Sequence, residues 1–256
     1  MIDRMMKILS TLTSILFLVG CSNGSAGPTG AQGPVGTGNY SFQAEFEAGL
    51  YPDSRYAGAD THWLDGSNPS TAPGTGGIEI ATGATTSNVA LGLVRFDLSY
   101  GVPSNANINA ASLQLTTQTN NTLSSGTYVF GVHQIIPPPA GHVPWNDAST
   151  WNVLIPPYGW DGGTSSPITV GADYNSTPMD AVTVTASQVN STQVLLSWNI
   201  LPSLAQVWTN TANNNFGVLI SPEPETSGSL SGSISFWDDT GNSQQKPKMI
   251  VEYAVP

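Results

Sequence analysis

Residues 111–116 read Ala-Ser-Leu-Gln-Leu-Thr, so apolar and polar side chains alternate over the whole stretch. Residues 94–98, Val-Arg-Phe-Asp-Leu, repeat this pattern. A period of two puts one face of a β-strand against a core and leaves the other face in water. Similar stretches lie at residues 128–132, 194–200, 216–220, 234–236 and 249–253. The sequence therefore predicts an all-β fold, an antiparallel β-sandwich of jelly-roll type.

One stretch has the spacing of a helix. Leu201, Leu204, Ala205 and Trp208 fall at positions i, i+3, i+4 and i+7, and Pro202 suits a first helical turn. We therefore expect one short helix at an end of the sandwich. Sandwiches of this size commonly form one domain, so a single β-sandwich domain is predicted for residues 40–256.

The N-terminus has the organisation of a secretion signal. Arg4 and Lys7 precede an apolar run at residues 8–19, which is too short to cross a bilayer comfortably and ends just before Cys21. This pattern resembles a bacterial lipoprotein signal, which predicts a signal peptide at residues 1–20 and a lipid on Cys21. We expect a protein anchored in the bacterial cell envelope, at the outer membrane or the cell surface, and facing outward.

Residues 21–39 form a linker of small and uncharged residues after the lipidated cysteine. Glycine recurs at every third position, at Gly27, Gly30, Gly33 and Gly36, as the crowded axis of a collagen triple helix requires. So few triplets do not hold three chains together alone. The segment is interpreted as a flexible spacer or as a trimerising stub, and both would lift the domain off the membrane.

Composition excludes several classes of partner. The chain has 256 residues, 17 acidic and 6 basic, with a formal net charge of -11. This charge repels phosphate backbones, so nucleic acid is not an expected partner, and other polyanions are disfavoured. The oligomeric state does not follow from composition.

The sequence does not indicate an enzyme. His62, His133 and His142 lack metal-ligand spacing, and no Gly-x-Ser-x-Gly nucleophile motif occurs. Lyase chemistry on acidic polysaccharides calls for basic or tyrosine side chains near the substrate carboxylate, and basic residues are scarce here. We therefore expect a protein that is not an enzyme.

Aromatic residues suggest a binding function. Sugar rings stack their apolar faces on exposed aromatic planes, while short polar groups bind the hydroxyls. The candidates for carbohydrate binding are Trp63, Tyr158, Trp160 and Trp237. The alternative for each is packing over an end of the sandwich.

An acidic turn suggests a metal. Calcium prefers six to eight oxygen ligands, and Asp238 and Asp239 lie in a turn rich in such groups. Asp60 could approach them if its strand lies beside the last strands, which would make a structural Ca²⁺ site. A solvated acidic turn is the alternative. Arg95 and Asp97 are interpreted as an exposed polar pair on one strand face.

Segments in the same order resemble those of a known bacterial family, the DNRLRE-type domain, which is related to carbohydrate-binding module family 96. The matching segments are residues 59–61, 93–99, 103, 110–115, 144–147, 150–152, 204–208, 215–217, 235–239 and 247–253. The chain departs from the family pattern at Trp237-Asp238-Asp239, where the family usually has Ser-Arg-Glu, and in the insert between Asp65 and Ile78. The resemblance implies a β-sandwich module of secreted and surface proteins, some of them associated with polysaccharides.

Two functions follow as expectations. The first is a surface-anchored module that binds an extracellular polysaccharide through loop aromatics. The second is a structural or adhesive surface or appendage component whose partner is a surface protein.

Overall fold

The computed structural model describes residues 40–256, apart from residues 75, 82–88, 140–141, 164, 211–213, 225–231 and 243–244. The described residues belong to one compact unit. The predicted signal peptide at residues 1–20, the lipidation site Cys21 and the linker at residues 21–39 lie outside the described residues. No helix within the described part is long and apolar enough to cross a membrane.

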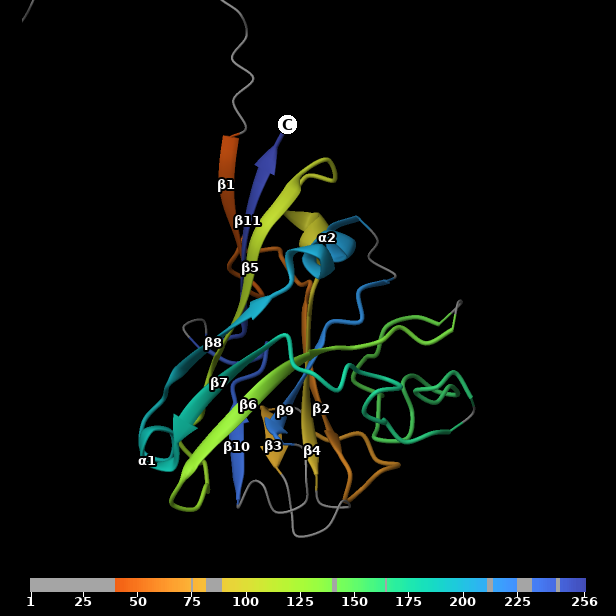
Figure 1. Ribbon diagram of the computed structural model, residues 1–256, viewed down its shortest axis with the longest axis vertical. Helices are drawn as coiled ribbons and strands as arrows, with labels where there is room; N and C mark the ends of the chain where they lie inside the picture. The colour runs from red at the N-terminus through yellow and green to blue at the C-terminus, as the bar shows by residue number, and fades with distance from the viewer. Residues whose placement is uncertain are drawn as a thin grey trace, which may run out of the picture. The chain divides into compact units, whose positions relative to one another are not determined.

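Two antiparallel sheets make up the unit (Figure 1). The smaller sheet has the order β1 (Tyr40–Phe46), β11 (Lys248–Val255), β5 (Asn107–Thr116) and β8 (Leu195–Ile200). The larger sheet has the order β10 (Ser233–Phe236), β3 (Ile78–Ala81), β4 (Ala90–Phe96), β9 (Val218–Glu223), β6 (Thr127–Gln134) and β7 (Asp180–Thr185), and β2 (Ala59–Asp65) also pairs with β4. The predicted all-β antiparallel sandwich is confirmed.

Helices are short and few in the described part. Helix α2 (Pro202–Asn210) forms where the spacing predicts it, and it buries Leu204, Ala205 and Trp208. A four-residue helix α1 (Ala186–Val189) was not expected, so the prediction of a single helix is wrong. It is too short for an apolar period, and its local signal is a capping box in which the Gln188 side chain accepts from the backbone N–H of Thr185 at 2.7 Å.

The main core lies between the two sheets. Leu113 of β5 is paired with Met249 of β11 on one side and with Trp198 of β8 on the other, and all three side chains are buried. The Trp198 indole N–H crosses the core and donates to the carbonyl of Phe130 in the larger sheet at 2.8 Å. The apolar side chains of the alternating strands therefore point inward and form the contact between the two sheets.

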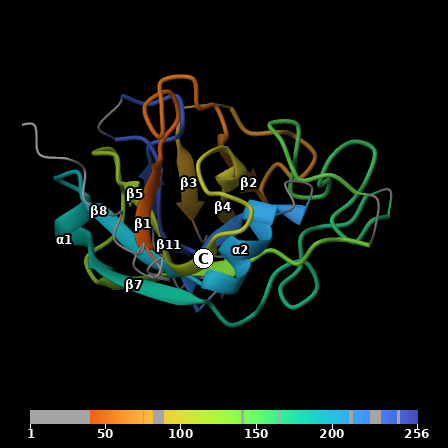
Figure 2. The same ribbon diagram turned by 90° about the horizontal axis from the view of Figure 1, so that it is seen from above.

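A second core lies on the opposite face of β4. Val94 points into the main core, whereas its neighbour Leu93 packs in the second cluster. The long connection between β6 and β7 supplies most of the other side of this cluster, including Trp145 and Trp160. Figures 1 and 2 show this connection as green loops that project to one side of β2 and β4.

Candidate ligand-binding site

Trp63, near the middle of β2, lines three hollows that adjoin one another. Its ring is half-buried, because it packs against the edge of the main core and still borders the open space. The first hollow has a volume of about 290 Å³ and the second about 210 Å³. We call the three hollows together the Trp63 trough.

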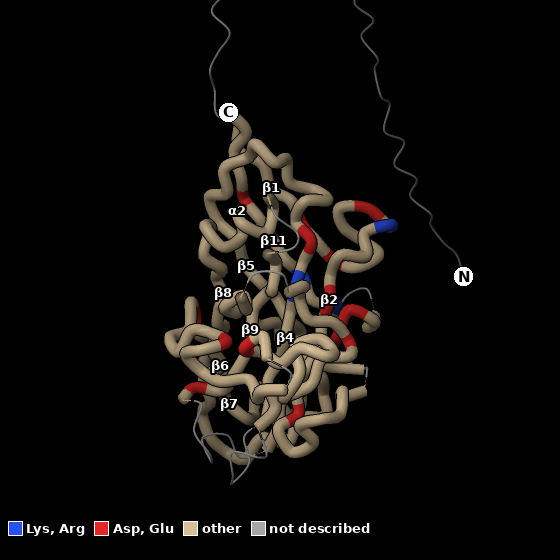
Figure 3. The backbone as a smooth tube through the Cα atoms, turned by 90° about the vertical axis from the view of Figure 1, so that its right-hand side faces the viewer, with Lys and Arg blue, Asp and Glu red and all other residues tan. Residues whose placement is uncertain are grey.

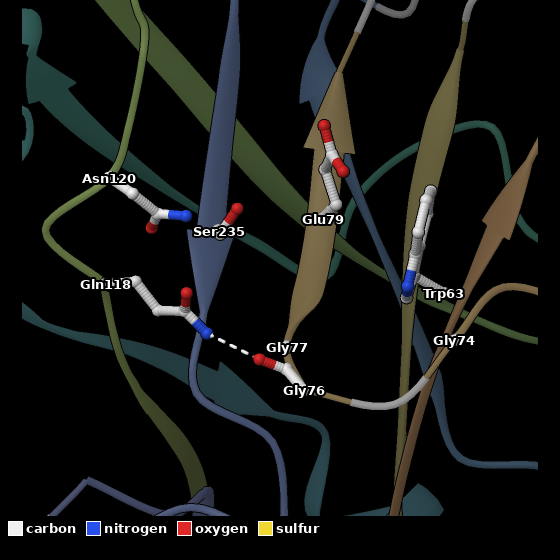
Figure 4. Close-up of a pocket in the computed structure, with 8 residues that line it drawn as sticks. All are labelled: Trp63, Gly74, Gly76, Gly77, Glu79, Gln118, Asn120 and Ser235. Carbon is white, nitrogen blue, oxygen red and sulfur yellow. Dashed lines mark hydrogen bonds between the residues drawn. The ribbon is translucent and has the colours of Figure 1, made fainter.

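Strand pairing places the polar groups of the first hollow. Glu79 of β3 lies opposite Ser235 of β10, so both side chains share the outward face of this strand pair. Figure 4 shows Glu79 and Trp63 on one side of the hollow, with Gln118 and Asn120 on the other side of β10. Carboxylate, amide, hydroxyl and indole groups therefore surround one space.

Side-chain amide contacts fix the segment that follows β5. The Gln118 side-chain amide donates to the carbonyls of Gly76 at 2.9 Å and Phe236 at 3.2 Å. Asn121 is buried, and its amide donates to Gln118 and accepts from the backbone N–H of Ser235. These contacts order the polar wall before any ligand arrives, which lowers the entropic cost of binding.

Gly77 lines the first hollow close to the Gln118 amide. A Cβ atom built there would lie 2.6 Å from the Gln118 amide nitrogen and 3.0 Å from the Phe236 carbonyl oxygen. An alanine there would require the end of the Gln118 side chain to shift.

The second hollow is acidic. Asp238 is 6% exposed, and one of its oxygens accepts from the Gly76 N–H at 2.8 Å while the other accepts from the Thr240 hydroxyl at 2.8 Å. Asp239 accepts from the Thr61 hydroxyl at 2.6 Å. Asp147 also lines this hollow. Figure 3 shows acidic residues gathered beside β2.

Burial raises the pKa of the Asp239 carboxyl above its ordinary value. The hydrogen bond from Thr61 lowers this pKa, and the neighbouring carboxylates of Asp238 and Asp60 raise it further. The acidic end of the trough therefore resists the approach of another negative charge.

Asp60 and Arg95 form an ion pair across neighbouring strands. The Arg95 Nε donates to Asp60 at 2.9 Å, and a second guanidinium nitrogen also contacts this carboxylate. The guanidinium lies 5.0 Å from the centre of the Trp145 ring. The interpretation of Arg95 and Asp97 as an exposed pair is wrong, since Asp97 instead accepts from the Ser99 N–H at the start of a short 3-10 helix.

The three predicted metal ligands do border one hollow. Within the described residues, however, no group of three or more His, Cys, Asp or Glu side chains is arranged to hold a metal ion. Asp238 uses both carboxylate oxygens on protein donors, and Asp60 is paired with Arg95. Calcium binding stays a prediction, for which Asp239 is the best-placed of the three carboxylates.

The other predicted aromatic residues lie elsewhere. Trp160 is 2% exposed and donates its indole N–H to the Thr150 carbonyl at 3.0 Å, so it presents no face to a ligand. Tyr158 is 45% exposed and packs edge-on against His142. Trp237 is half-buried, and its indole nitrogen is buried without a hydrogen-bond partner among the described atoms. Of the four candidates, Trp63 is the one that lines the trough.

Sequence reasoning missed Glu79, Gln118, Asn120 and Ser235. Glu79 and Ser235 lie on β3 and β10, which pair across a long separation in the chain, and Gln118 and Asn120 lie in the connection after β5, so no local motif brings the four residues together. Glu79 and Ser235 could have been found from the sequence. They are polar residues that alternate with apolar ones at residues 78–81 and 233–236, so their side chains point away from the core.

No protein-family model and no curated protein matches the chain. The resemblance to the DNRLRE-type domain therefore stays a prediction.

Proposed function

We propose that the protein binds an extracellular polysaccharide in the Trp63 trough. The observation that carries this proposal is that one partly buried indole borders three adjoining hollows lined by carboxylate and amide side chains. An indole face suits the apolar face of a sugar ring, and the polar groups beside it suit sugar hydroxyls. Adjoining hollows on several sides of the ring suit a chain of sugars better than a single ring.

The carboxylates that border the trough favour neutral polysaccharides over acidic ones as ligands. Glu79 and Asp65 border the trough at one end and Asp238 and Asp239 at the other. Within the described residues no Lys or Arg lines the three hollows, and Arg95, on the strand beside β2, is already paired with Asp60. Uronate or sulfate groups would meet repulsion there without a compensating partner.

The location we propose follows from the sequence. A lipid on Cys21 would hold the domain at the bacterial cell envelope, and residues 21–39 would separate it from the membrane. A module held in this way would retain a polysaccharide near the cell. The proposal includes no catalytic step.

The test is a glycan array followed by calorimetry with the neutral polysaccharide that gives the strongest signal. Trp63→Ala should weaken binding about tenfold, since loss of an aromatic stacking contact costs about 1 kcal/mol or slightly more. Glu79→Gln should weaken the binding of neutral polysaccharides. It should also reduce the preference for neutral over acidic polysaccharides. The control is Tyr158→Ala, which removes an exposed aromatic outside the trough. Equal affinity in wild type and Trp63→Ala would refute the site.

The second candidate function is a structural or adhesive surface component with a protein partner. It is favoured by the exposed aromatic side chains of Tyr40 and Phe42 on β1. This surface is apolar, whereas the trough is acidic. An array on which no glycan binds would favour this function over the first.

A further inference from the structure

Strand β2 has a free edge. It pairs with β4 along Ala59–Asp65, and no other strand or isolated bridge in the described part of the chain pairs with its outer side. Figure 1 shows β2 at the margin of the larger sheet. On such an edge, alternate residues direct both the N–H and the C=O away from the sheet. β2 therefore offers hydrogen-bonding groups to another extended segment.

The second hollow of the Trp63 trough runs along this edge. The residues of β2 that line it are consecutive, namely Asp60, Thr61, His62 and Trp63. The side chains of Thr61 and His62 point to opposite faces of the strand, because successive residues alternate. A hollow that borders residues of both faces meets the strand at its edge. Its volume of about 210 Å³ is several times that of a water molecule, which leaves room for a side chain of an added segment.

Charge selects the kind of segment that fits. Among the described residues, the hollow is lined by no lysine or arginine and by four carboxylates, those of Asp60, Asp147, Asp238 and Asp239. Asp147 is exposed and makes no hydrogen bond or ion pair within the described part. These carboxylates attract a basic segment. They repel a second copy of this chain, whose formal net charge is -11.

We propose that β2 is a docking edge for an extended segment of a partner protein that is rich in lysine or arginine. The segment adds to the larger sheet beside β2, and its basic side chains reach the carboxylates of the second hollow. Backbone pairing gives such a contact its affinity, and the carboxylates select the partner by charge. The inference does not rest on the polysaccharide proposal, because it uses the backbone edge of β2 rather than the indole face of Trp63.

Fluorescence anisotropy with a labelled peptide tests the docking. The probe is a peptide in which lysine and threonine alternate, and the protein is the full chain in neutral detergent, with EGTA present to keep calcium off the carboxylates. We expect saturable binding that weakens as the salt concentration rises. The same peptide with a methyl group on every backbone nitrogen keeps its charge but loses its N–H donors, so it should bind at least about tenfold more weakly. Equal binding of the two peptides, or no binding of either, would overturn the proposal.

Two matched variants each remove one negative charge. Asp147 lines the hollow, whereas Asp161 is an exposed acid that does not line it. Asp147→Asn should weaken binding of the lysine peptide about threefold, which is the contribution of one exposed ion pair, while Asp161→Asn should leave binding unchanged. Equal weakening by the two variants would show that the peptide responds only to the net charge of the protein, which would overturn the proposed site.

Hydrogen exchange locates the contact on the protein. The lysine peptide should slow the exchange of backbone amides in β2, because it pairs with the N–H groups of the free edge. Strand β1 is the matched control, since it also stands at the end of its sheet and pairs only with β11 among the described strands. Its amides should exchange at the same rate with and without the peptide. Protection of β1 in place of β2, or of neither strand, would refute the proposal.

Discussion

Trp63 and Trp160 both have acidic residues nearby in the sequence, but they differ in burial: Trp63 is partly buried and Trp160 is fully buried. Trp63 lies on a regular strand and borders the trough. Trp160 lies in a connection rich in proline and glycine and is buried with its indole N–H satisfied. The loop tryptophan is the structural one, and the strand tryptophan is the candidate for binding.

The difference has a physical cause. A connection as long as that between β6 and β7 needs apolar contacts of its own to remain ordered, because it has no sheet hydrogen bonds along most of its length. Its large apolar side chains, such as Trp145 and Leu154, therefore turn inward onto the outer face of β4. Aromatic residues in such a connection do not by themselves indicate a binding loop.

The largest expected effect comes from removing Trp160. Trp160→Ala should destabilise the protein by about 3–5 kcal/mol, because it leaves a cavity in the second core. The melting temperature should fall by about 10 °C, measured by differential scanning calorimetry.

Tyr158→Ala is the matched control for this change, since Tyr158 lies in the same connection and is 45% exposed. It should shift the melting temperature far less. If the two variants melt at the same temperature, the second core does not stabilise the connection in the way we infer.

A smaller expected effect is a dependence of the protein's stability on pH, caused by His62 beside the second core. Its ring is buried and stacks beside Trp145, and Nε2 lies 2.8 Å from the Ser149 carbonyl oxygen. Burial lowers its pKa below the ordinary 6.5. The unfolded chain therefore takes up the proton first, and stability is lost as pH falls below about 6.5. The melting temperature of the wild type should drop between about pH 7.5 and about pH 5.

His62→Gln removes this titrating group and offers an amide to Ser149. The melting temperature of the variant should fall less than that of the wild type over the same pH range, although the variant is less stable at neutral pH. The expected difference is smaller than the loss in Trp160→Ala. A wild type and variant with parallel pH profiles would show that another group controls the acid response.

The sequence was sufficient for the sandwich and for α2 because both depend on local periodicity, as at residues 111–116 and at Leu204 and Trp208. It named Trp63 as one of four aromatic candidates but did not distinguish it from Trp160, which is buried. It did not predict that Asp60 would pair with Arg95, since β2 and β4 meet only through the fold. The burial of a loop side chain depends in the same way on what the loop packs against.

The smallest expected effect concerns calcium at the acidic end of the trough. Burial and the nearby carboxylates raise the pKa of Asp239, so its negative charge at neutral pH costs stability, and that cost begins as pH rises above the ordinary 3.8. A cation beside Asp239 would offset the cost. Free calcium at about ten times its Kd would add about 1.4 kcal/mol, which corresponds to a rise of about 3 °C in melting temperature.

The calcium prediction is tested by thermal melting in EGTA, then with calcium or magnesium restored. Calcium should recover the lost stability and magnesium should not, because magnesium demands tighter octahedral geometry and gives up its water reluctantly. Asp239→Asn keeps an oxygen that can accept from Thr61 and removes the charge, so the variant should not respond to calcium. Trp160→Ala should respond as the wild type does, since its defect lies in the second core. A wild-type melting temperature that ignores EGTA, in protein that carries no calcium by elemental analysis, would leave Asp239 as a solvated acid and the trough without a metal.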